Sequence, residues 1–321
     1  MHRTGRAPNP LLNVFGLVLA IGVLFWFFNH QVPTFLSAGT MELLARQTAI
    51  VAVAALGMTL VIISGGIDLS VGSVVALTTV VIAALLKGGV NPWIAALAGV
   101  GTGAFCGLFN GMLITGLRIA PFIATLGTFL IARGFAKQIA HNQKIDPPLS
   151  WLNDLLAAVG KEQRWMLVPS GVWLTALLAF VVAVTLKYTV LGRKIYAVGS
   201  NELATRFSGI RVEGVKLAVY LLAGVLVGVA GLLQFSRLSV GDPTVAAGME
   251  LDVIAAVVIG GASLSGGTGT VIGSLLGAVL MATIRMGCTQ MGLEDWIQEV
   301  VTGGIIVLAV AIDSFRKGRS D

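Results

Sequence analysis

The chain has 321 residues, of which 56% are hydrophobic and only 11% are charged, and its mean hydropathy is +0.92. This composition excludes an ordinary soluble domain, in which about 25% of residues are charged, and the apolar stretches lack the alternation of a membrane β-barrel. The net charge of +6 comes from basic residues that collect in loops and form no helical stripe, which argues against nucleic-acid binding. We therefore expect an all-α polytopic membrane protein.

Ten apolar segments predict about ten transmembrane helices. In chain order they are Leu11–Phe28, Thr48–Ile63, Val71–Leu86, Pro92–Ile114, Pro121–Gln138, Val172–Leu186, Leu217–Phe235, Val253–Ala262, Val271–Ile284 and Ile297–Ile312. The first is expected to be a retained span, because no small-residue cleavage site of a signal peptide follows it. Together they predict one transmembrane domain over residues 1–321, with 11–313 embedded in the membrane.

Basic residues are unevenly shared between the predicted loops. If the N-terminus is cytoplasmic and the spans alternate, the larger share of Lys and Arg lies on the cytoplasmic side, mostly in the loop 187–216. Because positive residues favour the cytoplasmic face, this predicts that both termini are cytoplasmic. The longest polar connection, 139–168, is then periplasmic.

The segment VIISGGIDLSVGSV, residues 61–74, places the carboxylate Asp68 among glycines and small hydroxyl residues. A charge at membrane depth costs about 2.5–3.5 kcal/mol on insertion scales, so such a residue is a candidate for a functional site. The alternative is that Asp68 caps a helix that starts at Leu69, close to the water interface. Both interpretations end the preceding helix here.

A second glycine-rich segment, GGASLSGGTGT, resembles the first in its Leu-Ser pair and in the apolar runs that flank it. Paired, glycine-interrupted segments in the two halves of a transporter point to the substrate path, although breaks also arise for packing reasons.

The predicted span Pro92–Ile114 carries a glycine at every fourth position, which permits close helix contact. The glycines are Gly99, Gly103, Gly107 and Gly111. Asn110 on the same span could hydrogen-bond across helices or face a substrate path. Arg133 in the fifth span is expected to extend to the interface.

Two loops contain short amphipathic stretches. Ser150–Val159 predicts a helix that would suit the membrane surface. In the loop 187–216, Ser200 is expected to cap a helix of about two turns that ends at Gly209, with apolar residues on one face. A helix this short needs a partner surface. The membrane, the same domain or another protein could supply it.

Several kinds of chemistry are absent from the sequence. No GxxxxGK[ST] phosphate loop occurs, so the chain is not expected to hydrolyse ATP itself. The three histidines lie outside the predicted spans, and no metal-ligand spacing is present. An enzyme is therefore not expected. A self-sufficient carrier and a permease driven by a partner ATPase remain. The long basic loop favours the permease, since ion-coupled carriers more often show charge pairs in their spans.

Several segments resemble the permease subunits of ribose-type sugar ABC importers. They are ALGMTLVIISGGIDLSVGSVVAL, NGMLITGLRIAPFIATLGT, GRKIYAVGSNELATRFSGIRV, GGASLSGGTGTVIGSLLGAVL and VVTGGIIVLAVAID. The resemblance spans about Gln47 to Asp313. One departure is the sequence Arg285-Met286-Gly287-Cys288, where members often carry Asn-Gly-Leu before the last span, so the contribution of this region to substrate choice is open.

The resemblance implies an importer in the bacterial cytoplasmic membrane, built from two permease subunits, identical or different, two ABC ATPase subunits and an external, periplasmic or lipid-anchored sugar-binding protein. The chain would bind no cofactor, because the partner ATPase uses ATP and Mg²⁺. The helix around Asn201–Ser208 would be the coupling helix in a cleft of the ATPase. Its expected coupling residues are Ser200, Asn201, Glu202, Leu203, Arg206 and Phe207.

We therefore expect alternating-access import of a monosaccharide such as ribose, galactose, xylose or arabinose. Candidates for lining or gating the path are Ser64, Asp68, Ser70, Ser73 and Asn110. The predicted topology places Asp68 near the cytoplasmic side, which favours a gate or hinge over a central sugar ligand. The alternatives are an ion-coupled secondary transporter, or an ABC permease for a nucleoside, an autoinducer or a branched-chain amino acid.

Overall fold

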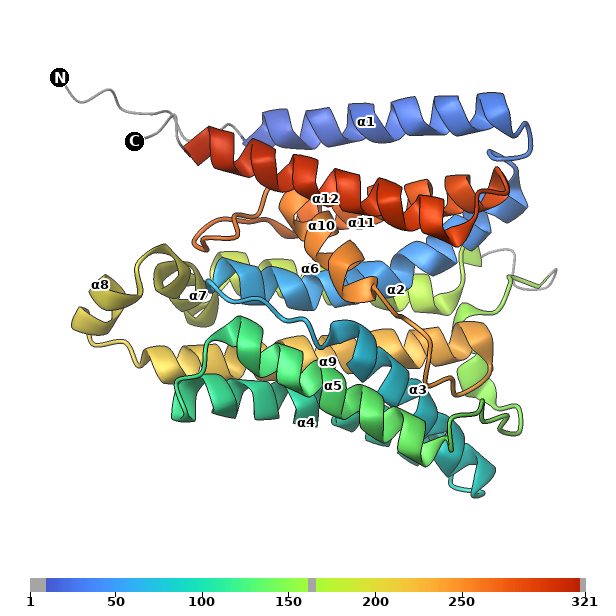
Figure 1. Ribbon diagram of the computed structural model, residues 1–321, viewed down its shortest axis with the longest axis horizontal. Helices are drawn as coiled ribbons and strands as arrows, with labels where there is room; N and C mark the ends of the chain where they lie inside the picture. The colour runs from blue at the N-terminus through green and yellow to red at the C-terminus, as the bar shows by residue number, and fades with distance from the viewer. Residues whose placement is uncertain (1–9, 161–165, 318–321) are drawn as a thin grey trace.

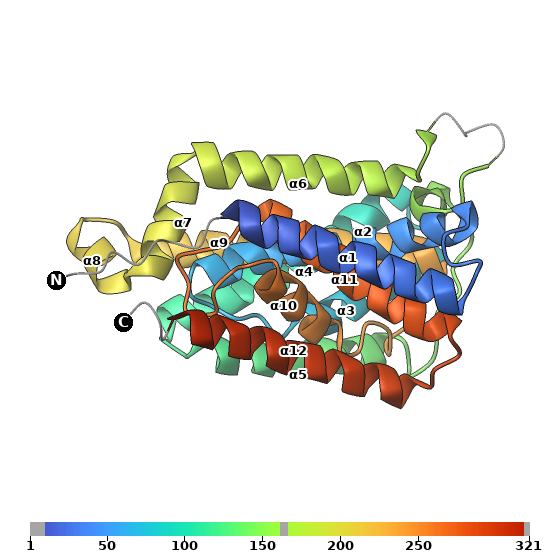
Figure 2. The ribbon, with the colours of Figure 1, turned by 90° about the horizontal axis from the view of Figure 1, so that it is seen from above.

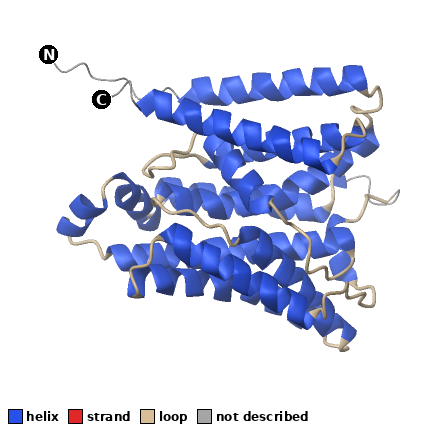
Figure 3. Cartoon of the chain, viewed as in Figure 1, coloured by secondary structure: helices blue, strands red, loops and turns tan. Residues whose placement is uncertain are grey.

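The structure is a computed structural model that describes residues 10–160 and 166–317. Every regular element in these two ranges is a helix (Figure 3). The helices are α1 (Pro10–Gln31), α2 (Ala38–Ile63), α3 (Val71–Lys87), α4 (Pro92–Gly116), α5 (Pro121–Ile139), the 3-10 helix η1 (Trp151–Leu156), α6 (Ser170–Tyr188), α7 (Val190–Ser200), α8 (Glu202–Phe207), α9 (Val212–Leu238), α10 (Met249–Ile259), α11 (Val271–Gln290) and α12 (Asp295–Lys317).

Within the described residues, six helices are long and apolar enough to cross a membrane. They are α1, α2, α4, α6, α9 and α11. The ten predicted spans are therefore not confirmed as a set. Helix α3 is apolar but has 17 residues, and α10 has 11. Helix α5 and the first turn of α12 contain charged residues.

Helix α2 starts at Ala38, ten residues before the predicted start at Thr48. The prediction was wrong because Glu42 and Arg46 interrupt the apolar run there. Ser37 caps the helix by accepting the backbone N–H of Thr40. The carboxylate of Glu42 accepts the backbone N–H of Val159 at 2.8 Å, so this polar first part of α2 packs against the 139–168 connection.

The bundle has two groups of helices joined by α2 (Figures 1 and 2). Helices α3, α4, α5 and α9 form one group, and α1, α10, α11 and α12 form the other. Helix α2 packs against both α9 and α11, and its apolar residues from Ala49 to Ile63 are almost all buried. Helix α6 covers another side of α2. The core of the molecule therefore follows α2.

Helices α4 and α9 pack backbone to backbone through their glycines. A Cβ at Gly103 would overlap the carbonyl oxygen of Gly224, and one at Gly107 would overlap the carbonyl oxygen of Tyr220. Gly111 also faces α9, whereas Gly99 faces Ile82 and Thr78 of α3. The row on α4 therefore serves packing, as small residues do where lipid supplies no hydrophobic drive. This contact fixes the position of Asn110 on α4.

Candidate functional site

Asp68 lies in the non-helical segment 64–70 between α2 and α3, and it is 3% exposed. Its Oδ1 accepts the backbone N–H of Ser70 at 2.8 Å and the Ser70 hydroxyl at 2.6 Å. Helix α3 begins at Val71, not at Leu69, and Ser70 is its N-cap residue. The capping expectation is therefore corrected: Asp68 stabilises the turn before the helix through bonds to the residue two positions on.

Asn110 reaches the same turn from α4. Its Nδ2 donates to the Ser70 hydroxyl oxygen at 3.1 Å, and its Oδ1 is buried without a partner among the described residues. The carbonyl of Ile67 lies 3.3 Å from the Thr125 hydroxyl of α5 and 3.4 Å from the Tyr220 hydroxyl of α9. Side chains from three helices thus hold the segment around Asp68.

The two other candidates do not join this chain of hydrogen bonds. The Ser64 hydroxyl donates to the Val61 carbonyl of its own helix at 2.8 Å. Ser73 is fully buried, and its hydroxyl has no partner among the described residues. The structure therefore brings together Asp68, Ser70 and Asn110 in a closely packed position, which suits a hinge or gate better than an open sugar site.

The two glycine-rich segments meet at the end of α7. The backbone N–H of Gly267 donates to the Ile63 carbonyl at 2.9 Å, and the Tyr196 hydroxyl of α7 donates to the Gly269 carbonyl at 2.7 Å. A Cβ at Gly199 would overlap the same Ile63 carbonyl oxygen. We call the backbone contact between Ile63, Gly199 and Gly267 the glycine joint. It connects both glycine-rich segments to Gly199, the second-last residue of α7.

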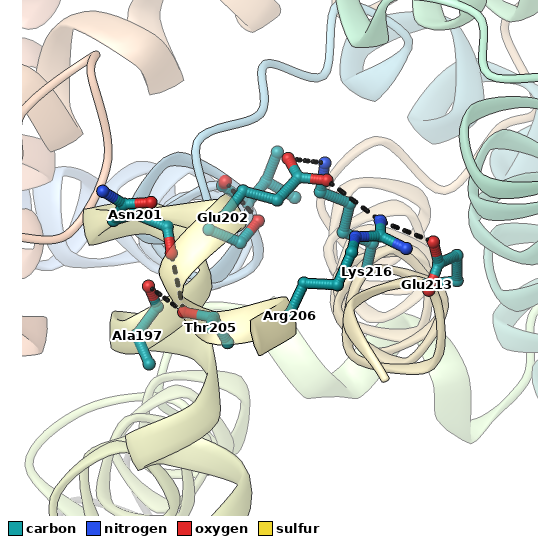
Figure 4. A network of polar contacts seen from close by, with 9 residues as sticks. Ala197, Asn201, Glu202, Thr205, Arg206, Glu213 and Lys216 are labelled. Atoms are coloured by element: carbon teal, nitrogen blue, oxygen red, sulfur yellow. Dashed lines mark hydrogen bonds and ion pairs between the residues drawn. The ribbon is translucent and has the colours of Figure 1, made fainter. Parts of the chain in front are cut away.

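Helix α8 is the expected coupling helix, but its cap differs from the prediction. Ser200 is the last residue of α7, and Asn201 is the N-cap, with its side chain accepting the Ala204 N–H at 2.9 Å. Asn201 holds this role because its backbone is extended, with a φ of −157°. The Thr205 hydroxyl lies 2.8 Å from the carbonyls of both Ala197 and Asn201, which ties α8 to α7 (Figure 4).

Ion pairs join α8 to the first turns of α9 (Figure 4). Lys216 lies 2.6 Å from the Glu202 carboxylate, and Arg206 lies 2.6 Å from Glu213 and 3.6 Å from Glu202. The hydrogen bond with Glu213 raises the pKa of Arg206 above its usual range. Glu202 and Arg206 therefore have partners within the chain, so their structural role is to orient α8.

Two apolar side chains of α8 face outward and are not covered by the described residues. Leu203 is 68% exposed and Phe207 is 88% exposed. Large apolar residues that are exposed and surrounded by polar groups indicate an interaction surface. Among the expected coupling residues, the charged ones thus hold α8 in place and the two apolar ones are exposed.

The sequence did not predict a polar cavity of about 280 Å³ near the other end of α9. Its polar lining comes from α2, α9, α10, α11 and α12, and comprises Gln47, Gln234, Arg237, Asp252, Arg285, Thr289 and Gln298. Asp252 and Arg285 form an ion pair at 2.6 Å. Each helix contributes only one or two of these residues, so no single segment shows the pattern.

The loop after α9 completes the cavity wall, and Arg133 holds this loop. The Arg133 guanidinium donates to the carbonyls of Pro243 and Val245, at 2.8 Å each. The expectation that Arg133 extends to the interface is thereby corrected, because these carbonyls bind it within the fold. Nearby, burial alone would raise the pKa of Asp242, but hydrogen bonds from Thr244 and the Lys144 cation outweigh it and lower this pKa.

The part of the 139–168 connection around η1 packs on the same end of α9. The predicted amphipathic stretch Ser150–Val159 forms the 3-10 helix η1, whose Leu152 and Leu156 are fully buried. The Leu156 N–H donates to the Ser236 hydroxyl at 2.8 Å. This stretch therefore packs on α9, where a membrane-surface position was considered. A second cavity of about 430 Å³ lies beneath it and shares Arg237 with the first.

Comparisons with known proteins place these features in context. The family described as branched-chain amino acid transport system / permease component matches residues 40–310. The ribose import permease protein of Escherichia coli strain K12 is 38% identical over 92% of both chains. That of Bacillus subtilis strain 168 is 39% identical, over 95% of this chain and 92% of the relative. The L-arabinose ABC transporter permease protein of Azospirillum brasilense is 32% identical over 96% and 90%. No solved structure matches the chain.

Proposed function

Because the chain belongs to the family of branched-chain amino acid transport system permease components, we propose that it is the membrane-spanning subunit of an ATP-driven importer of a monosaccharide. The observation that carries the proposal is the similarity to ribose import permeases over 92% or more of the chain. A pentose such as ribose or arabinose is the favoured solute, since relatives of both kinds match. The chain acts in the bacterial cytoplasmic membrane and hydrolyses no ATP itself.

The partners of the chain are an ABC ATPase, a second permease subunit and an external sugar-binding protein. The ATPase receives α8, where Leu203 and Phe207 are exposed and the ion pairs to α9 hold the helix in place. The loaded binding protein docks on the connections 139–168 and 236–250. ATP binding moves α8, and the path between the two permeases alternates between the two sides.

The arrangement of the helix ends supports cytoplasmic termini. Figure 1 shows the start of α1 and the end of α12 at the same end of the bundle as α8. If α8 faces the ATPase, that end is cytoplasmic. We propose that α3, α5, α10 and α12 add to the six helices that are long and apolar enough to cross a membrane. This gives ten membrane-embedded helices, with the glycine-rich segments as breaks between them.

The segment around Asp68 acts as a cytoplasmic gate or hinge in this proposal. Asp68, Ser70 and Asn110 form the hydrogen-bonded part, while Ser64 and Ser73 flank it. The glycine joint supports this role, because it brings the end of α2 against Gly199 near the end of α7, the helix that leads into α8.

The coupling surface is tested with the complete importer in proteoliposomes. Leu203→Asp and Phe207→Asp place a charge where the ATPase cleft is expected to take an apolar side chain. We expect each to reduce ATP-dependent ribose or arabinose uptake at least tenfold and to weaken ATPase binding, because desolvating an unpaired charge costs several kcal/mol.

Leu117→Asp is the matched control, because Leu117 is 69% exposed in the turn between α4 and α5 and lies outside α8. Normal ATPase binding and normal sugar uptake in both α8 variants would contradict the coupling assignment.

An ion-coupled carrier is the second candidate, and one observation favours it. Asp252 and Arg285 form a charge pair between α10 and α11, which is the kind of feature that such carriers use. Uptake by this chain alone, driven by an ion gradient, would support that function. A nucleoside, an autoinducer or a branched-chain amino acid would replace the sugar if uptake of these solutes exceeds that of pentoses and hexoses.

A further inference from the structure

The polar cavity near the end of α9 contains buried groups that lack partners. Asp252 is 4% exposed, its Oδ2 pairs with Arg285, and its Oδ1 has no hydrogen-bond partner among the described residues. The buried Nε of Arg237 also lacks one there. A buried polar group without a partner costs about 1–3 kcal/mol, and more if it is charged. A molecule bound in the cavity would supply the hydrogen bonds that these atoms lack.

The lining selects the chemistry of this molecule. The free Asp252 oxygen needs a donor, whereas the Arg237 N–H needs an acceptor, and Gln234 offers both. A hydroxyl group both donates and accepts, so a polyhydroxylated solute can satisfy all of these side chains. An anionic carboxylate would leave the Asp252 oxygen unsatisfied and would be repelled by it.

The size of the cavity suits a small solute. About 280 Å³ lies just below the range of about 300–1,000 Å³ that is typical of pockets for drug-sized ligands. A monosaccharide is smaller than such ligands and carries a hydroxyl on most of its carbons. A single water molecule would fill only a small part of this volume.

The position of the cavity suits an early stage of import. Arg237 is in the last turn of α9, and Glu213, which pairs with α8, is in the first. At 1.5 Å per residue, these two residues are about 35 Å apart along the helix. The cavity thus lies at the end of the bundle opposite the proposed ATPase surface, beside the connections proposed to dock the binding protein.

We infer that this cavity binds the transported sugar after its release from the binding protein, with Asp252, Arg285, Arg237 and Gln234 as its polar contacts. The inference rests on the proposed function. It also assigns a role to Arg285, the first residue of the segment Arg285–Cys288 in which the sequence departs from the ribose-type pattern. Its guanidinium holds Asp252 so that one carboxylate oxygen faces the sugar.

Transport per ATP hydrolysed tests the inference in the complete importer. Arg285→Met and Gln234→Leu are expected to reduce pentose uptake per ATP hydrolysed about tenfold, while binding-protein-stimulated ATPase activity is retained. Lys87→Met is the control, because Lys87 is an exposed cation at the end of α3 and outside the cavity. Uptake per ATP within twofold of the unmodified complex in both cavity variants would overturn the inference.

A charge exchange separates sugar binding from a structural role. The double variant Asp252→Arg/Arg285→Asp restores an ion pair but reverses the groups that face the solute. A purely structural pair predicts recovery of uptake together with assembly. Sugar binding predicts that assembly recovers and uptake stays at least tenfold low. Full recovery of uptake overturns the inference.

Alkylation detects occupancy directly. Ala247 lines the cavity and is exposed, so Ala247→Cys, with Cys106 and Cys288 replaced by alanine, can be labelled with a maleimide in the full complex. The transported pentose, added at saturating concentration, is expected to slow labelling at least threefold, and to leave labelling of Lys87→Cys, an exposed position outside the cavity, unchanged. Unchanged labelling at Ala247→Cys would mean a water-filled cavity and would overturn the inference.

The two levels of failure are distinguishable. If the unmodified complex takes up no pentose or hexose, the proposed function and the inference both fail. If the unmodified complex transports sugar and the cavity variants transport it equally well, only the inference fails.

Discussion

At the scale of single residues, the segment around Asp68 shows what a lone carboxylate does in this fold. Asp68 bonds to Ser70, Ser70 accepts from Asn110, and the neighbouring Ile67 carbonyl is held from α5 and α9. The sequence singled out Asp68 because a charge at membrane depth is costly, and Asn110 because it is a polar residue in a predicted span. It could not show that they meet, because their positions are 42 residues apart and no periodicity relates them.

Asp68→Asn tests whether the negative charge matters beyond the turn. The amide oxygen of asparagine can still accept both Ser70 bonds, although hydrogen bonds to a neutral group are weaker by about 1 kcal/mol. We expect assembly to remain near normal and ATP-dependent uptake to fall several-fold.

Thr102→Ala is the control for Asp68→Asn, because the Thr102 hydroxyl bonds only within α4. Unchanged uptake in Asp68→Asn would leave this residue with its turn-forming role alone.

At the scale of elements, the sequence predicted a helix start best where the first residue itself favours a first helical turn. Helices α4 and α5 begin at the predicted residues Pro92 and Pro121, since proline fits the first helical turn. Helix α7 was missed, and the stretch that forms η1 was predicted as a helix but considered for the membrane surface, because both positions depend on packing against α6 and α9. The cavity was missed for the same reason: its polar residues gather only when five helices converge.

The α4–α9 contact predicts a sharp difference between two glycines of one helix. Gly107→Ala would drive a methyl group into the backbone of α9, and overpacking of this kind costs about 1–3 kcal/mol. Gly101→Ala is the matched control, since no described atom lies within 4 Å of a Cβ at Gly101. We expect Gly107→Ala alone to lower the midpoint of thermal unfolding in detergent. Equal midpoints would contradict the packing role.

The glycine joint predicts that Gly199 has no tolerance for a side chain. Gly199→Ala would push against the Ile63 carbonyl oxygen and would separate the end of α2 from the second break. We expect α8 to be displaced and coupling between ATP hydrolysis and uptake to be lost, even where the complex assembles. The readout is uptake per ATP hydrolysed.

Gly214→Ala serves as the control for Gly199→Ala, since a Cβ at Gly214 has no described neighbour within 4 Å. Coupling in Gly199→Ala equal to that of the Gly214→Ala control would contradict a mechanical role of the joint.

At the scale of the whole molecule, the bundle has two functionally different ends. One end carries α8, the glycine joint and the segment around Asp68, and the other carries the polar cavity and the second cavity beneath the 139–168 connection. Helix α2 spans between them, with Gln47 in the cavity and Ile63 in the joint. This connection offers a direct route by which movement of α8 could change the cavity.

Sugar import driven by a partner ATPase is the function that we propose for this chain. It is tested most directly by radiolabelled ribose or arabinose uptake into proteoliposomes that contain the chain, the ATPase and the binding protein. We predict that the sugar accumulates inside the proteoliposomes when ATP is present on the side that the ATPase faces. We predict no accumulation when ATP or the ATPase is omitted, whether or not an ion gradient is present. Accumulation by the chain alone under a proton or sodium gradient would contradict the claim.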